Sequence, residues 1–502
     1  MTTATQYPRL HSLGAVALVL ATLLPVLLVN TPPLIDVLGH MGRYELQTRL
    51  GELPWLAQFY TFRWQVIGNL GADLLVQVLH PVLGPAGAAK FAVVLVPLLA
   101  ATAILLLSRQ VHGRITPFAI AALALVYGLP FTWGFLNFSL AMALALLAFV
   151  LWLRLGPGWR RAALFVPISL AVWLCHTFGW AFLGILCTAE SLARGAGTDQ
   201  PATRRLLGAI RENLPLLAPL APMLAWRSTA AGVGIDGWFD LAQKAQWLTS
   251  VLRLQAQAID IASAGFLLLL VLVPAACGWV RVDRRIGLAA AIAFGAFLLL
   301  PKQIFGSVFA DMRLAPYAAM LALLALRERE AAGRSRALLM LVCIGFLGAR
   351  LTLTAFVYRE REDALETQLA ALDSIPARAR VAVLVEVPCQ EEWALPWFSH
   401  IGSMALVRRH VFVNDQWANS SMNPLRVHFP AAGAYATDDK QLFFPEHCNR
   451  SPTLKQALGA LPVRAFTHVW VVGVAPSKIP ARPDLERSWR RADAAIYRVV
   501  AP

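Results

Sequence analysis

Hydrophobic residues in this chain gather into long runs that are separated by short polar segments. Eleven such runs cover residues 12–30, 87–108, 115–131, 136–153, 162–175, 178–193, 208–226, 259–279, 286–300, 314–326 and 337–356. Runs of this kind are typical of helices that cross a bilayer. The pattern predicts an α-helical polytopic membrane protein with about eleven transmembrane helices, and the first run is expected to remain as a membrane helix rather than a cleaved leader.

Basic residues cluster in every second segment between these runs. The clusters are Arg109 and Arg114; Arg154, Arg160 and Arg161; Arg194, Arg204 and Arg205; Arg281, Arg284 and Arg285; and Arg327, Arg329, Arg334 and Arg336. Short arginine-rich loops stay on the cytoplasmic side of a membrane. We therefore expect a bacterial inner-membrane protein with its N-terminus in the cytoplasm and its C-terminus in the periplasm.

This orientation requires residues 162–193 to cross the membrane twice. As one straight helix the segment would rise about 48 Å, which exceeds a hydrocarbon core of about 30 Å. A single crossing would also place the cluster at Arg194 on the wrong side. The sequence therefore predicts two short helices with a turn near His176 and Thr177.

Four segments are then expected on the outer face. The loops 31–86, 227–258 and 301–313 belong to a transmembrane domain of residues 1–360, and residues 361–502 form an α/β domain. Within the first loop, Trp64–Leu79 is amphipathic and is expected to lie in the membrane interface. After a charged helix at Tyr358–Leu372, apolar segments at 380–387, 466–474 and 494–500 predict strands, of which the first two are neighbours in the centre of a sheet.

Composition agrees with a membrane protein. The 502 residues are 58% hydrophobic and only 15% charged, and the net charge of +15 comes largely from loop arginines, so we do not infer nucleic-acid binding. The six cysteines show no metal-ligand spacing. Cys389 and Cys448 both fall in the expected periplasmic domain, where they could form a disulfide or remain two free thiols.

The first candidate site follows the first membrane helix, in Thr31–Arg43. On a helix that starts near Leu34, Asp36, His40 and Arg43 would lie on one face. Asp36 could act as a base toward an acceptor hydroxyl, or it could serve only as helix N-terminal charge. His40 could bind a divalent cation with Asp36 or be an interfacial side chain, and Arg43 and Arg63 could bind phosphate or extend to the interface.

The second candidate site is the outer loop 301–313. Lys302, Asp311 and Arg313 could bind an anionic lipid headgroup, although Asp311 and Arg313 could also form a simple surface pair. Three polar residues lie within the membrane helices on their outer halves: His176, Asn137 and Arg350. His176 could line a cavity or make an interhelical hydrogen bond, Asn137 could cap its helix or line the same cavity, and Arg350 needs a buried partner.

These features resemble the GT-C superfamily of integral membrane glycosyltransferases. Asp36 matches the acid of their first outer loop, Arg313-Leu-Ala-Pro316 resembles their Arg-Tyr-x-x-Pro run, and the turn at Cys175-His176 resembles their helix break. The resemblance implies inverting transfer of a hexose or pentose from a polyprenyl-phosphate lipid to a glycan, lipid or protein acceptor. It leaves a divalent cation open, because Asp36 is followed by Val37 rather than by a second acid.

The leading hypothesis is therefore an enzyme. Asp36 would deprotonate the acceptor, while Arg313 and Lys302 would hold the leaving phosphate. A lipid-linked sugar flippase is a second hypothesis, but it predicts polar residues in both halves of the bilayer and favours internal repeats, neither of which the sequence shows. A non-catalytic scaffold with a periplasmic binding domain is the third, and it predicts that Asp36 is dispensable.

Overall fold

The computed structural model describes residues 8–196, 201–226, 234–304, 307–329, 333–389, 391–418 and 423–500. These residues fall into two compact units. The first unit comprises Met1–Leu28, Ile67–Gly71 and Val93–Val357, and the second comprises Val29–Val66, Ala72–Ala92 and Tyr358–Pro502. The chain therefore contributes its first polar loop and its C-terminal region to the same unit.

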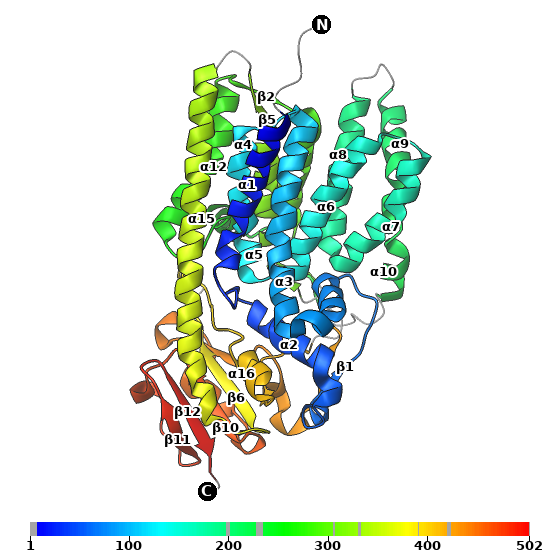
Figure 1. The fold of residues 1–502 in the computed structure, drawn as a ribbon. Coiled ribbons are helices and arrows are strands. Elements are labelled where there is room, and N and C mark those ends of the chain that lie inside the picture. The colour runs from blue at the N-terminus through cyan, green and yellow to red at the C-terminus, as the bar shows by residue number, and fades with distance from the viewer. Residues whose placement is uncertain are drawn as a thin grey trace. The chain divides into compact units, whose positions relative to one another are not determined.

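The first unit is built from helices (Figure 1). They are α1 (Pro8–Leu27), the C-terminal part of α3 (Gly71–His112), α4 (Pro117–Ala122), α5 (Leu129–Trp133), α6 (Leu136–Leu155), α7 (Trp159–Cys175), α8 (Thr177–Gly195), α9 (Ala202–Asn213), α10 (Leu220–Trp226), α11 (Leu241–Thr249), α12 (Gln257–Ala276), α13 (Arg284–Leu299), α14 (Ala315–Leu324) and most of α15 (Gly333–Leu369). Two short ladders join β2 (Val280–Val282) to β5 (Leu326–Glu328) and β3 (Gln303–Ile304) to β4 (Ser307–Val308).

Burial separates helices inside this unit from helices at its surface. The helix α6 packs against α7 and α8, and most of its side chains are buried. By contrast α12 and α15 expose large apolar side chains, among them Leu268, Leu272, Leu341 and Phe356. Apolar side chains on an exposed helix face are expected where that face contacts lipid.

The described helices cover each of the eleven apolar runs. Four of them are long and apolar enough to cross a membrane: Gly71–His112, Leu136–Leu155, Gln257–Ala276 and Arg336–Ser374. Three shorter apolar helices lie at Leu13–Leu27, Pro117–Trp133 and Met312–Leu324. The fold is thus that of a helical membrane protein, while eleven crossings and the orientation of the termini remain predictions.

The turn expected in the fifth and sixth runs is present. The helix α7 ends at Cys175, α8 begins at Thr177, and His176 between them has extended backbone with φ −166°. The expected charged helix from Tyr358 is present as the C-terminal part of α15, which runs to Leu369. No glycine or proline interrupts residues 349–369, so the membrane helix continues into the charged segment.

The expected amphipathic segment Trp64–Leu79 is helical only from Gly71 onward. Residues 67–71 instead pack on the turn at His176, where Leu70 N donates to Leu174 O and Thr177 N donates to Gly68 O. A Cβ at Gly68 would lie 2.3 Å from Thr177 Oγ1, so this approach requires glycine. Backbone pairing with the helix break therefore keeps residues before Gly71 out of the helix.

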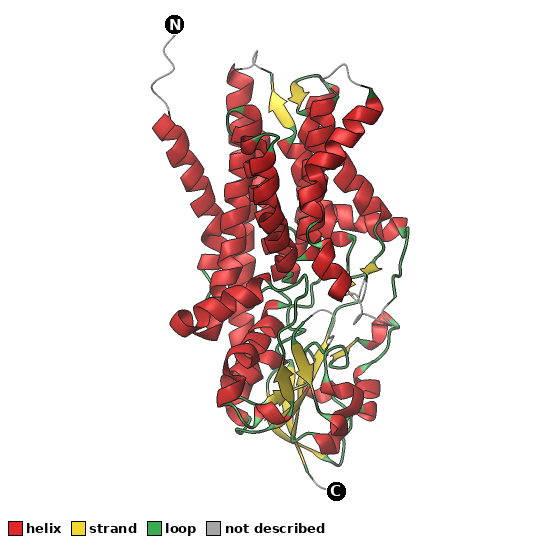
Figure 2. Cartoon of the chain, turned by 90° about the vertical axis from the view of Figure 1, so that its right-hand side faces the viewer, coloured by secondary structure: helices red, strands yellow, loops and turns green. Residues whose placement is uncertain are grey.

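The second unit contains a mixed sheet, whose strands are yellow in Figure 2. Its order is β11 (Leu485–Arg490), β12 (Ala494–Val499), β10 (His468–Val472), β6 (Arg380–Glu386) and β7 (Phe412–Val413), and β9 (Leu442–Phe443) also pairs with β6. The central strands β6 and β10 are parallel with Val383 opposite Trp470. This confirms that the apolar segments 380–387 and 466–474 form neighbouring central strands.

Other elements of the second unit come from both ends of the chain. They are α2 (Val37–Arg49), β1 (Tyr60–Phe62), the first part of α3, the end of α15, α16 (Gly402–Arg409), β8 (Leu425–Val427) and α17 (Leu454–Ala460). The strand β1 pairs with β8 in antiparallel register, with Thr61 opposite Arg426. The first polar loop is thereby hydrogen-bonded to the C-terminal region.

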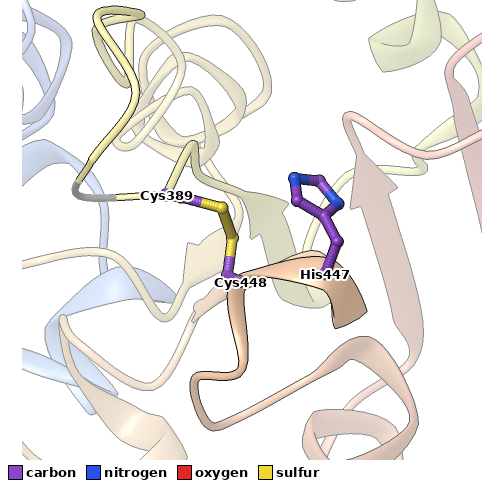
Figure 3. A group of neighbouring side chains, drawn as sticks. All are labelled: Cys389, His447 and Cys448. Carbon is purple, nitrogen blue, oxygen red and sulfur yellow. A yellow bond between two sulfur atoms is a disulfide. The ribbon is translucent and has the colours of Figure 1, made fainter.

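Cys389 and Cys448 form a disulfide with a Cα–Cα distance of 5.4 Å. Of the two alternatives left open by the sequence, the structure has the bonded pair. Figure 3 shows the bridge, with the ring of His447 beside it. The bridge ties the segment after β6 to the turn before α17 across 59 residues of sequence.

Candidate functional site

Asp36 lies at the N-terminus of α2, which starts three residues later than expected. Its backbone is helical, with φ −85° and ψ −9°, and its side chain makes no capping hydrogen bond to the helix. The chain entering this turn is held by Glu362, whose carboxylate accepts from the backbone N–H groups of Asn30 (2.5 Å) and Thr31 (2.8 Å). Asp36 is thus fixed by its backbone, and its side chain stays 17% exposed.

His400 faces the Asp36 carboxylate. Its Nε2 lies 3.7 Å from Asp36 Oδ1, and the ring packs against Trp417 with centroids 4.5 Å apart. Gly39 makes room for these rings, because a Cβ there would lie 2.6 Å from Trp417 and 3.0 Å from His400. The sequence gives no local signal for His400, which is 364 positions away from Asp36 and lies in no motif.

Acidic side chains lie around His400, and one of them, Asp415, is buried. Burial acts against its charged form, yet Asp438, Asp36 and Asp415 together raise the pKa of His400 above its ordinary value. Burial also raises the pKa of Asp415 to about 6, although His400 and hydrogen bonds from Ser403 act to lower it. The Asp36 carboxylate therefore lies next to the His400 ring, which is titratable and held by a hydrogen bond.

The other candidates of the first loop have different surroundings. Arg43 is 2% exposed and pairs with Asp73, with Nη1 at 2.7 Å from Oδ1. His40 Nδ1 lies 3.3 Å from Arg43 Nη2, and its ring packs against Trp417. On the predicted face of the helix, His40 therefore contacts Arg43. The guanidinium of Arg43 is neutralised by the buried carboxylate of Asp73, which the sequence did not indicate. Arg63 is exposed, and its backbone N–H donates to Pro424 O.

Arg313 is a buried cation in the first unit. Its side chain is 6% exposed, and its guanidinium lies 4.0 Å from the centroid of the Phe135 ring. Arg313 Nη2 donates to Ser307 Oγ at 2.9 Å and to Val308 O at 3.3 Å. These contacts hold the charge in one place among aromatic rings, where water does not screen it.

His176 presents a second hydrogen-bond donor to the same place. Its Nδ1 accepts from the backbone N–H of Phe178 at 3.1 Å, so the proton of the neutral ring must reside on Nε2. That Nε2 lies 3.4 Å from Arg313 Nη1. Two N–H groups that face each other in this way cannot form a hydrogen bond with each other. An anionic oxygen between them would accept from both.

The remaining loop candidates play different parts. Asp311 pairs with Lys244 at 3.2 Å, and both side chains are 2% exposed. This buried pair, rather than a surface pair of Asp311 with Arg313, is what the structure shows. Lys302 is half-buried, and its backbone is fixed by hydrogen bonds to Gly237 O and from Ala310 N.

The two other intramembrane polar residues have partners. Asn137 Nδ2 donates to Asn69 O at 2.8 Å, which fastens residues 67–71 to α6 near the turn at His176. Arg350, which required a partner, pairs with Asp260 at 2.9 Å and donates to Leu252 O at 2.7 Å. Asn137 thus helps to hold the segment that packs on the turn at His176, and Arg350 joins α15 to α12.

One group of three potential metal ligands converges among the described residues: Cys389, His447 and Cys448. Two of these are joined in the disulfide of Figure 3, and His447 Nε2 lies 3.2 Å from Glu392. A disulfide sulfur is not a thiolate and does not bind a cation as one. Cation binding by Asp36 and His40 stays a prediction.

The chain shares its fold with two solved structures of ArnT, and a shared fold agrees with the architecture that the resemblance in the sequence implied. The chain matches ArnT from Cupriavidus metallidurans in the apo state, with TM-score 0.50, 12% identity and coverage of 97% of each chain. It also matches ArnT from Cupriavidus metallidurans bound to undecaprenyl phosphate, with TM-score 0.50, 11% identity and coverage of 98% of each chain. No family model and no curated protein sequence matches the chain.

Proposed function

We propose that this chain is a membrane glycosyltransferase that moves a sugar from a polyprenyl-phosphate lipid to an acceptor on the outer face of the bacterial inner membrane. The fold supports the class, since ArnT, which shares it, has been crystallised with undecaprenyl phosphate. The apolar helix surfaces supply a lipid environment for the donor. The observation that carries the proposal is the pair of hydrogen-bond donors that the Arg313 guanidinium and His176 Nε2 form.

These two hydrogen-bond donors fit the phosphate of a polyprenyl lipid. The guanidinium of Arg313 supplies a fixed positive charge, and His176 Nε2 adds an N–H group at 3.4 Å from Arg313 Nη1. A phosphate oxygen between them would accept from both, and Phe135, Phe138 and Phe178 around Arg313 limit access of water. Lys302, in the same loop as Arg313, would add a second cation to the leaving phosphate.

Asp36 would serve the acceptor. Its carboxylate takes the proton of the acceptor hydroxyl as the oxygen forms a bond to the anomeric carbon of the sugar. The bond from that carbon to the phosphate breaks, and polyprenyl phosphate leaves with its charge held by Arg313 and Lys302. One displacement of this kind inverts the anomeric configuration, and the transferred sugar would be a hexose or a pentose.

Several features agree with an outer-face acceptor. The Cys389–Cys448 disulfide persists in an oxidising compartment, which for a bacterial inner-membrane protein is the periplasm. The arginine clusters in every second segment between the apolar runs favour the cytoplasmic side for those segments. A glycan, a lipid or a protein could each offer the hydroxyl group. Arg43 would support this site by fixing α2 through Asp73 rather than by binding phosphate.

The test is binding of undecaprenyl phosphate to the purified full-length protein, measured by native mass spectrometry in detergent. Arg313→Ala should weaken binding about tenfold to a hundredfold, since a hydrogen bond to a charged group contributes about 1.5–3 kcal/mol. Arg285→Ala is the matched control, because Arg285 pairs with Asp283 at the N-terminus of α13, on the expected cytoplasmic side. Equal loss in both variants, or no loss with Arg313→Ala, would refute the role of Arg313.

Binding alone does not separate a transferase from a flippase, so turnover is the second readout. In membranes that contain polyprenyl-phosphate sugars, the wild-type chain should convert the lipid-linked sugar to polyprenyl phosphate plus a glycosylated product. A flippase would leave the lipid-linked sugar chemically intact.

A further inference from the structure

The second unit places a histidine directly behind the proposed base. Asp36 and His400 come from segments that are joined at a glycine face of α2, where Gly39 admits the rings of His400 and Trp417 and Gly42 admits Gln416 and Ser403. Larger residues at these positions would force the segments apart. The close approach therefore serves the pairing of Asp36 with His400 as well as packing.

We propose that His400 is a positioning residue that orients Asp36 and receives the acceptor's proton from it during transfer. The proposal rests on the proposed function of Asp36 as the base. It assigns a catalytic task to the C-terminal region, which contributes no residue to the mechanism otherwise. His400 does not touch the sugar or the acceptor in this scheme, and it acts only through Asp36.

Hydrogen bonding selects the tautomer that this task requires. His400 Nδ1 lies 3.3 Å from the backbone carbonyl oxygen of Asp415, which can only accept, so Nδ1 carries the proton. The lone pair of the neutral ring is then on Nε2, which faces Asp36 Oδ1 at 3.7 Å. This distance is longer than a hydrogen bond, and proton transfer requires the two groups to approach or one water molecule to bridge them.

The surroundings of His400 favour the protonated ring. The acids that face it are Asp36 just before α2, Asp415 after β7, and Asp438 and Asp439 in the loop before β9. The ring of His40 packs on Trp417, which also contacts His400. The carboxylates raise the pKa of His400 even though burial acts to lower it. An imidazolium formed here is therefore stabilised by the acids around it.

The protons balance in two steps. The acceptor hydroxyl gives its proton to the Asp36 carboxylate while the acceptor oxygen bonds to the anomeric carbon and the sugar–phosphate bond breaks. Asp36 then passes that proton to His400 Nε2, which restores the carboxylate and leaves an imidazolium. The imidazolium loses its proton to water before the next turnover. No oxidant, reductant or further reactant is required.

The first arm of the test does not depend on activity. In the full-length protein with labelled histidines, NMR titration should give a lower pKa for His400 in Asp36→Asn than in the wild type, by about one pH unit for a neighbouring charge removed. The His400 signal is assigned by its loss in His400→Gln. His447, which faces Glu392 in the same unit, is the internal control and should not shift. An unchanged pKa of His400 would overturn the proposal.

The second arm measures transfer from polyprenyl-phosphate sugar against pH. His400→Gln should lower kcat at least tenfold, leave KM for the donor unchanged, and remove the limb of the pH profile that His400 causes. His410→Gln is the matched control, because His410 also faces a carboxylate, that of Glu45 at 3.3 Å. A rise in KM together with a lower melting temperature, and no change in the pH profile, would show a merely structural role.

The two proposals fail in different ways. If Asp36→Asn abolishes transfer while His400→Gln retains the wild-type kcat, only the role of His400 is overturned. If Asp36→Asn retains full transfer, the proposed function of Asp36 is wrong, and the role of His400 falls with it.

Discussion

His176 Nε2 and Arg313 Nη1 lie 3.4 Å apart, and both carry hydrogens. The assignment follows from the backbone N–H of Phe178, which occupies the other ring nitrogen of His176 as a donor. The helix break between α7 and α8 is what exposes that N–H, since the first residues of a helix lack intrahelical acceptors. A feature of the secondary structure thus fixes the tautomer of His176 and provides the N–H group on which the proposed phosphate site depends.

His176→Phe should weaken binding of undecaprenyl phosphate about tenfold. The new ring keeps an aromatic side chain next to Phe138 and Phe178 but removes the N–H group. Native mass spectrometry of the full-length protein measures the effect. His112→Phe is the control, since His112 is a buried histidine of the same unit that bonds to Leu324 O instead. Undiminished binding in His176→Phe would show that His176 does not contact the phosphate.

The pKa of Asp415 predicts a pH dependence of stability in the second unit. Burial raises this pKa from 3.8 to about 6, so the folded state binds the proton more tightly than the unfolded state does. The resulting stabilisation is complete below about pH 4 and is lost as the pH rises through about 6. The raised pKa of His400 acts in the same direction at higher pH: its contribution is complete below about 6.5 and is lost above that value.

Asp415→Asn removes the titrating group and keeps oxygen and nitrogen atoms near Ser403, whose N–H and hydroxyl donate to Asp415 in the wild type. The melting temperature of the variant relative to the wild type should therefore rise between pH 4.5 and pH 7. Intrinsic tryptophan fluorescence during heating provides the measurement. A constant difference across this range would show that Asp415 does not titrate there.

Membrane orientation has its own test. A periplasm-dependent reporter fused after Pro502 should be active, and the same reporter fused near Gly333 should be silent. A fusion near Gly197 should also be silent, because α7 and α8 are expected to form two crossings that meet at His176. Activity of the Gly197 fusion would contradict the double crossing.

Local sequence patterns were enough to predict several elements. The apolar segments around Val383 and Trp470 predicted adjacent central strands because continuous apolar runs require burial on both faces. The length of residues 162–193 predicted the break at His176, since one straight helix over this apolar segment would exceed the hydrocarbon core. Arg350 was expected to have a buried partner, although only the fold identifies it as Asp260.

Long-range partners could not be predicted. Asp73 for Arg43, Lys244 for Asp311 and His400 for Asp36 are all distant in sequence from the residues that they contact. The strands β7 and β9 contain two residues each, which is too short for a period to be detected. Burial of charges is decided by tertiary packing, so their partners become visible only in the fold.

Asp36 is the proposed base of the glycosyl transfer reaction, and the Asp36→Asn variant removes that base. The variant keeps the shape of the side chain, so it should reach the membrane with the wild-type melting temperature and still bind undecaprenyl phosphate. Conversion of polyprenyl-phosphate sugar to polyprenyl phosphate and glycosylated product, measured by mass spectrometry of lipids from membranes, should fall at least a hundredfold. Conversion by Asp36→Asn at the wild-type rate would contradict the account.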